Sequence, residues 1–161
     1  MSKANQPDYE LLAEQADALI GGESDALANT ANFVALLYDN LDRVNWTGVY
    51  VLRGDELVLG PFQGKPACIR IPLGKGVCGT AAQKRESILV ADVHAFEGHI
   101  ACDPASRSEL VVPLICNGKL LGVLDIDSPD TDRFSVADKA GIETMCARLI
   151  RQIERAGGAF I

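Results

Sequence analysis

The sequence predicts an α+β domain in which helices pack on a central antiparallel β-sheet. Two amphipathic segments with helical periodicity open the chain, and a long segment of the same kind closes it. Between them the apolar period drops from about 3.6 residues to 2, as expected for strands. No repeat, low-complexity stretch or linker interrupts this order. We therefore expect one domain.

The first two segments are predicted to be amphipathic helices. Residues 8–20 carry one apolar face, and Gly21-Gly22 ends that helix. Ser24 is the predicted N-cap of a second helix, whose apolar stripe continues to Leu41.

The middle of the chain alternates short strands with breaks. Residues 46–53 and 56–60 form a predicted hairpin, followed by a strand at 68–72, a short helix at 77–85 and a strand at 87–92. Residues 93–106 show no periodicity, and a loop of that length in a compact domain usually carries function or disorder.

A second hairpin and a long helix complete the chain. Residues 109–127 are predicted to form two strands that turn at Asn117-Gly118. Ser135, with Asp138 three residues later, predicts a capping box for a helix that ends near Arg155.

Composition excludes several classes of partner. A chain of 161 residues can bury a core without metals or disulfides. A net charge of −7 disfavours nucleic acid and anionic membrane surfaces. No apolar run approaches the ~18 residues of a membrane span. The first eight residues lack the apolar segment of a signal peptide, which predicts a cytoplasmic protein.

The cysteines divide into two groups. Stable disulfides are rare in a reducing compartment, so cysteines there are either small buried hydrophobes or chemically active. Cys68, Cys78 and Cys102 fall in the loop-rich middle, which favours chemistry. Cys116, in a predicted strand, and Cys146, on the apolar stripe of the last helix, are predicted core thiols.

An acidic strand end is the second candidate feature. Side chains alternate along a strand, so Asp125 and Asp127 share one face of the strand that begins at Gly122. Either this strand runs out into solvent, or its carboxylates line a pocket. The sequence leaves both interpretations open.

Glu109 lies on that face only if the register of the hairpin pairs it with an acidic residue of the other strand. A two-residue Asn-Gly turn sets Glu109 opposite Ile126, whereas a longer loop or a bulge sets it opposite an acidic residue. Pro113 is a candidate position for a bulge. Three carboxyls sharing a pocket would raise at least one pKa, and that group could donate a proton near neutrality. If all stayed charged, they would form a cation site.

Three other patterns support weaker predictions. Gly74–Gly79 matches a dinucleotide-binding glycine motif, but the predicted helix after this motif is too short for the crossover of a parallel unit. The glycines of the motif are expected to serve a tight turn and close packing. The spacing of His94, His99 and Cys102, with Asp103, matches no common zinc site. Trp46 is either a core aromatic or an apolar wall for a methyl group.

The chain resembles a GAF domain and, more narrowly, the free methionine-(R)-sulfoxide reductases. The marks are the sequences at 45–50, 74–79, 97–103 and 122–128, together with the spacing of Cys68, Cys78 and Cys102. The resemblance covers nearly the whole chain. It implies one GAF domain over residues 1–161, with an N-terminal helix in 1–22 and a C-terminal helix in 134–156.

The resemblance also implies a site. Cys102 would attack the sulfoxide sulfur and become a sulfenic acid, Cys68 would resolve it as a disulfide, and Cys78 would be a lesser or alternative resolver. Glu109 and Asp127 are the candidate acids. Substrate contacts would come from Trp46, Tyr50, Asp125, Asp127 and Glu109.

The implied substrate is free methionine sulfoxide, and thioredoxin is the implied reductant. We expect no cofactor and no metal, and a homodimer is possible within the resemblance. A ligand-sensing GAF module or a redox sensor would use the same fold without turnover.

Overall fold

A single antiparallel sheet lies between two unequal layers in the computed structural model, which describes residues 6–100, 102 and 104–160. The four α-helices and six strands are α1 (Tyr9–Ile20), α2 (Ala26–Asn40), β1 (Trp46–Arg53), β2 (Glu56–Gly64), β3 (Arg70–Pro72), α3 (Gly76–Lys84), β4 (Ile88–Val90), β5 (Ser108–Cys116), β6 (Lys119–Ser128) and α4 (Val136–Arg155). The predicted α+β class is confirmed.

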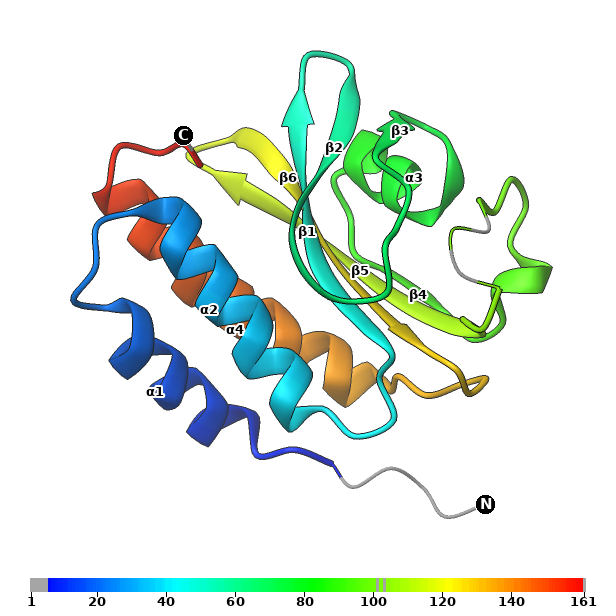
Figure 1. The fold of residues 1–161 in the computed structure, drawn as a ribbon, viewed down its shortest axis with the longest axis horizontal. Helices are drawn as coiled ribbons and strands as arrows, with labels where there is room; N and C mark the ends of the chain where they lie inside the picture. Colours follow the sequence, from blue (N-terminus) through cyan, green and yellow to red (C-terminus); the bar gives the residue numbers. More distant parts are fainter. Residues whose placement is uncertain (1–5, 101, 103, 161) are drawn as a thin grey trace.

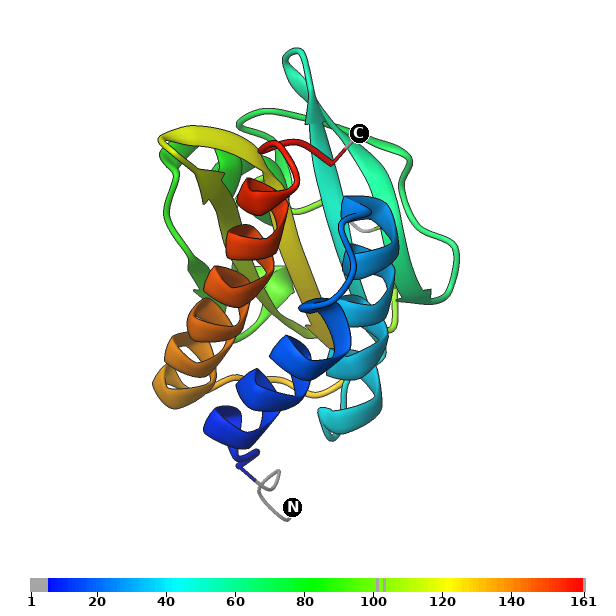
Figure 2. The same ribbon diagram turned by 90° about the vertical axis from the view of Figure 1, so that its left-hand side faces the viewer.

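Three helices cover one face of the sheet and a smaller layer covers the other. The strand order is β3-β2-β1-β6-β5-β4. Helices α1, α2 and α4 pack together on one side, while α3 lies on the opposite side near β3 (Figures 1 and 2). Among the described residues, no helix is long and apolar enough to cross a bilayer.

Strand alternation divides β6 between these two layers. Leu124 and Ile126 belong to the core beneath the three helices, whereas Val123 belongs to the smaller core on the α3 side. Asp125 and Asp127 have the parity of Val123 and therefore face the α3 side. This face is where the candidate site lies.

Most element boundaries agree with the sequence analysis. Strand β1 has the predicted limits, and the Ser135–Asp138 capping box is present. The predicted N-cap Ser24 is wrong by one residue, because the Asp25 side chain accepts from the Ala28 N–H instead. An Asp carboxylate caps a helix as well as a Ser hydroxyl does, so these two neighbours compete.

The β2 strand continues four residues beyond its predicted end at Gly60. It pairs with β1 as far as Gly64 but with β3 only over Glu56–Val58. Pro61 therefore lies where one side of the strand has no ladder partner in β3, a position that tolerates proline. The predicted strand at 68–72 is correspondingly shorter, since β3 spans Arg70–Pro72.

A bulge in the β5–β6 hairpin sets the position of Glu109. The turn has two residues, because Cys116 pairs with Lys119, but the register shifts between Leu114 and Ile115. Leu121 is the extra residue, so the bulge lies on β6 and not at Pro113. Beyond it, Glu109 pairs with Asp127. The predicted dependence on parity holds, and the bulge brings Glu109 to the acidic face.

The glycine motif at 74–79 allows close packing of the chain and does not form a dinucleotide-binding turn. Strands β3 and β4, on either side of α3, lie at opposite edges of the sheet. Helix α3 is therefore not the crossover of a parallel unit that dinucleotide binding requires. A Cβ at Gly79 would come within 2.4 Å of the Pro72 carbonyl oxygen, so this glycine allows close packing.

Candidate functional site

The α3-side layer contains a small cavity of about 40 Å³. It is lined by seven of the residues singled out from the sequence: Trp46, Tyr50, Cys78, Cys102, Glu109, Asp125 and Asp127. These residues come from β1, α3, the loop before β5, β5 itself and β6. Segments far apart in the sequence thus meet at one cavity.

One of these lining residues, Cys102, is joined to a second cysteine. Cys68 and Cys102 form a disulfide whose Cα atoms lie 5.4 Å apart. The bond ties the chain before β3 to the loop after η1 (Val93–Ala95), across 34 residues of sequence. Cys78, Cys116 and Cys146 are free and buried.

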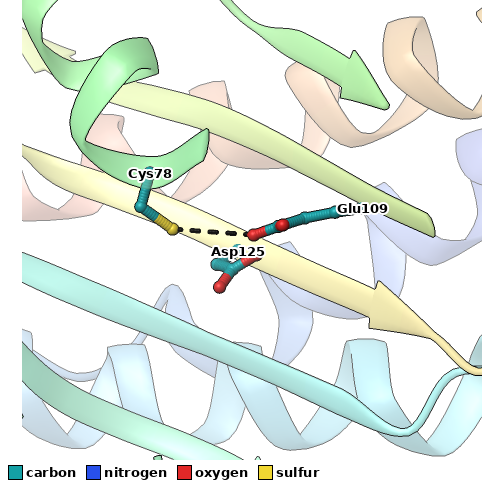
Figure 3. A group of neighbouring side chains, drawn as sticks. All are labelled: Cys78, Glu109 and Asp125. Atoms are coloured by element: carbon teal, nitrogen blue, oxygen red, sulfur yellow. Dashed lines mark hydrogen bonds between the residues drawn. The ribbon is translucent and has the colours of Figure 1, made fainter. Parts of the chain in front are cut away.

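Three buried groups converge at the same cavity. Cys78 projects from α3, Glu109 from β5 and Asp125 from β6 (Figure 3). The Cys78 thiol donates a hydrogen bond to Glu109 Oε1 at 3.8 Å. Glu109 and Asp125 are each only 6% exposed, which decides against a strand end in open solvent. The acidic face of β6 lines a pocket.

Burial controls the protonation of this cluster. Desolvation, followed by the charges of Asp125 and Asp127, raises the pKa of Glu109 well above its usual value. Desolvation also raises the pKa of Asp125 and of the Cys78 thiol. A carboxyl with a raised pKa keeps its proton to a higher pH than a solvated carboxyl does and can donate it. The cluster therefore has the properties of a proton donor.

An aromatic wall closes one side of the cavity. The Trp46 ring stacks on Tyr50, with 5.8 Å between centroids, and on Phe62, with 5.4 Å. The Trp46 indole N–H donates to the Lys65 carbonyl, which fixes the ring. Trp46 is thus both a buried core residue and a cavity wall, so the two interpretations left open by the sequence are compatible.

Tyr50 connects this wall to the disulfide. Its hydroxyl donates to the Cys68 carbonyl at 3.0 Å. Burial raises the pKa of the phenol, so it stays a neutral donor. The contact holds the Cys68 backbone against the sheet.

Several lining residues were not singled out from the sequence. Ile71, Lys75, Val77 and Ser106 also line the cavity, and Phe62 supports Trp46 from β2. Their residue types are common in ordinary cores and loops, so no local signal marks them. His99 lines the cavity, but Cys102 of the same sequence pattern is bonded to Cys68, which agrees with the expectation that this pattern is not a zinc site. Asp103 lies outside the described residues.

Comparisons with known proteins agree on one family. The GAF domain model matches residues 25–153. A free methionine-R-sulfoxide reductase of Escherichia coli is 51% identical over 141 residues, which is 88% of this chain and 86% of that protein.

Solved structures are similarly close. The reduced form of the fRMsr of Staphylococcus aureus has a TM-score of 0.92 and 52% identity, covering 95% of this chain and 99% of that chain. A free methionine-R-sulfoxide reductase of Neisseria meningitidis, solved with its substrate, has a TM-score of 0.90 and 38% identity over 97% of this chain and 96% of that chain.

Proposed function

We propose a function from one premise: this chain belongs to the GAF domain family and, within it, to the free methionine-R-sulfoxide reductases. On this proposal it is an oxidoreductase that converts free L-methionine-(R)-sulfoxide to methionine. The observation that carries the proposal is the shared cavity, in which a cysteine of the Cys68–Cys102 disulfide meets buried carboxyls and an aromatic wall.

The first step is attack by the Cys102 thiol sulfur on the sulfoxide sulfur. A sulfoxide oxygen leaves poorly until it is protonated, so the step needs an acid. Glu109 and Asp127 are the proposed donors, and the raised pKa of Glu109 supports that role. The new sulfur–sulfur bond then breaks as the oxygen passes to the Cys102 sulfur. The substrate sulfur is reduced and leaves as methionine, while Cys102 is oxidised to a sulfenic acid.

The second step forms the disulfide. The Cys68 thiol attacks the sulfenic sulfur of Cys102, the S–S bond forms and water leaves. The Cys68–Cys102 bond in the structure is the product expected of this step and supports the choice of Cys68 over Cys78 as resolver. Cys78 is buried among carboxyls, and its raised pKa keeps it a thiol, which makes it a poorer nucleophile.

The remaining groups bind the substrate in this proposal. Trp46 and Tyr50 contact the methyl and methylene groups, and Asp125 accepts from the α-amino group. Asp125 Oδ1 is buried without a hydrogen-bond partner among the described residues, which supports such a role. Glu109 and Asp127 contact the sulfoxide oxygen as they protonate it.

Thioredoxin is the proposed reductant. Its dithiol would attack the Cys68–Cys102 bond, release both thiols and become a disulfide itself. A cycle of this kind needs a compartment that supplies reduced thioredoxin, so we place the protein in the cytoplasm.

A homodimer is proposed from the family resemblance. The exposed leucines of α1 and α2, Leu11, Leu19 and Leu27, would lie at its contact. Sedimentation velocity tests this proposal, which fails if the chain sediments as a monomer at micromolar concentration.

Product analysis tests the proposed activity. The reduced protein, supplied with thioredoxin, thioredoxin reductase and NADPH, should release methionine from the free (R)-sulfoxide and not from the (S)-epimer or from N-acetylmethionine sulfoxide. Amino-acid analysis quantifies the product. A ligand sensor or redox sensor would release no methionine beyond that of a Cys102→Ser control, and this result would overturn the proposal.

A further inference from the structure

The proposed reaction leaves one buried thiol unused. Cys78, Glu109 and Asp125 each offer one ligand atom, and these atoms lie within 4.8 Å of one another. Figure 3 shows that each side chain comes from a different element, α3, β5 and β6 respectively. Because those elements are held by the sheet and its packing, the three atoms converge without any loop having to fold around them.

An unsatisfied oxygen points to a missing ligand. Asp125 Oδ1 is fully buried and has no hydrogen-bond partner among the described residues. A buried polar atom without a partner is costly and uncommon in folded proteins. Asp125 also lines the cavity, beside Cys78 and Glu109.

The donor set selects the chemistry of that ligand. One sulfur and two carboxylate oxygens suit a borderline-soft cation such as Zn²⁺, whereas Mg²⁺ and Ca²⁺ prefer oxygen alone. Zinc–sulfur and zinc–oxygen bonds of about 2.3 and 2.0 Å put tetrahedral ligands roughly 3.5 Å apart. The Cys78 Sγ and Glu109 Oε1 atoms are 3.8 Å apart.

The cavity and the charges also fit a cation. About 40 Å³ is enough for a small ion that keeps a water as its fourth ligand. The cluster holds acidic groups only, so a dication would replace protons that the buried groups otherwise retain. Such a site would depart from the expectation of no metal drawn from the sequence.

We propose that Cys78, Glu109 and Asp125 bind a thiophilic divalent cation of the zinc class. On binding, the Cys78 S–H bond is replaced by a metal–sulfur bond and the proton is released to solvent, with no change in oxidation state. If the proposed function is correct, the cation also occupies Glu109 and Asp125, so it is a reversible inhibitor of the reductase.

Cadmium titration of the disulfide form tests the site without any turnover. In that form Cys68 and Cys102 are tied together, which leaves Cys78, Cys116 and Cys146 as the thiols. Cd²⁺ should produce the ultraviolet charge-transfer absorption of a cadmium–thiolate bond, saturating at one ion per chain. Zn²⁺ should abolish this absorption by competition. A wild-type protein that gives no such absorption overturns the proposal.

Matched cysteine variants assign the sulfur. Cys78→Ser should lose the absorption, whereas Cys116→Ser and Cys146→Ser, which remove buried thiols outside the cluster, should keep it. An absorption that persists in Cys78→Ser, shown to be folded by circular dichroism, overturns the proposal.

An oxygen variant keeps the test decisive if Cys78→Ser does not fold. Asp125→Asn retains every thiol and should bind Cd²⁺ at least about tenfold more weakly, the smallest loss expected even for an outer-shell partner. Wild-type affinity in Asp125→Asn would overturn the site. Zn²⁺ should also slow alkylation of Cys78 in the wild type, measured by peptide mass mapping, and an unchanged rate would count against it.

An activity arm separates this proposal from the proposed function. With turnover established, Zn²⁺ should inhibit and a chelator should restore the rate. Intact cadmium binding in a protein that releases no methionine would overturn the reductase function and leave the metal site standing. A turnover rate that is unchanged at saturating Zn²⁺ would refute the proposal that the cation inhibits the reductase.

Discussion

The disulfide partners differ in the chemistry proposed for them. Cys102 lies half-buried at the cavity that holds the carboxyls, and Cys68, which does not line the cavity, is bonded to it. Tyr50 holds the Cys68 carbonyl. The proposal therefore assigns attack to Cys102 and resolution to Cys68.

Serine variants separate these two steps. Cys102→Ser should release no methionine even in a single turnover, because it lacks the attacking sulfur. Cys68→Ser should release about one methionine per chain and then stall with thioredoxin. Quenched-flow sampling with amino-acid analysis measures both, and Cys116→Ser is the matched control. Loss of the first turnover in Cys68→Ser would contradict its assignment as resolver only.

The carboxyls are expected to govern rate. Glu109→Gln or Asp127→Asn removes a proposed proton donor and should slow the chemical step by about 10²-fold or more. Because burial raises the pKa of Glu109, the wild-type rate should fall only as the pH rises through that raised pKa. Single-turnover rates across pH provide the measurement. A wild-type pH profile in both variants would return these residues to a structural role.

At the scale of the elements, the bulge at Leu121 positions the proposed acid Glu109. The bulge changes the register so that Glu109 pairs with Asp127. Gly122 follows it, and a Cβ there would come within 2.0 Å of the Tyr50 carbonyl oxygen. The close approach of β1 and β6 beside the site therefore depends on this glycine.

Gly122→Ala tests that dependence. The added methyl group would clash with the Tyr50 backbone, so the free energy of unfolding should fall by about 1–3 kcal/mol. The single-turnover rate should also fall, because Tyr50 and the carboxyls shift together. Urea unfolding and quenched flow measure the two effects. Gly22→Ala, where nothing lies within 4 Å of the added Cβ, is the control. Equal stability of the two variants would contradict the account.

The sequence predicted this region incompletely for a physical reason. Alternation was enough to set Asp125 and Asp127 on one face, and the Asn-Gly turn was enough to define the hairpin. The register of the hairpin depends on the bulge, and nothing in the sequence marks Leu121 as the extra residue. The contacts of Phe62 with Trp46 and of Tyr50 with Cys68 likewise come from segments that only the folded sheet brings together.

At the scale of the whole molecule, the two faces of the sheet divide stability from chemistry. The larger apolar core lies under α1, α2 and α4, and it was visible in the sequence as helical stripes. The smaller core on the other face shares its space with the cavity. Charged groups buried there oppose folding unless they are protonated, so the stability of the molecule should depend on pH.

That dependence has a definite sign. The folded-state pKa of Glu109 lies above its usual value of 4.5, so the native state binds the proton more tightly than the unfolded chain. Its contribution to stability is complete below about 4.5 and is lost as the pH rises through the raised pKa. The amide side chain introduced by Glu109→Gln does not ionise, so the free energy of unfolding should fall less over this pH range in the variant than in the wild type. The difference between the two decreases should exceed about 1 kcal/mol. Urea unfolding against pH measures this, and parallel curves would contradict it.

The proposed reaction consumes two thiols for each sulfoxide. The most direct measurement is a single turnover of the fully reduced protein with free methionine-(R)-sulfoxide and no reductant. We predict one methionine per chain, a fall from five free thiols to three, and a Cys68–Cys102 disulfide in the peptide map. Methionine released with all five thiols retained, or a thiol loss without methionine, would contradict this prediction.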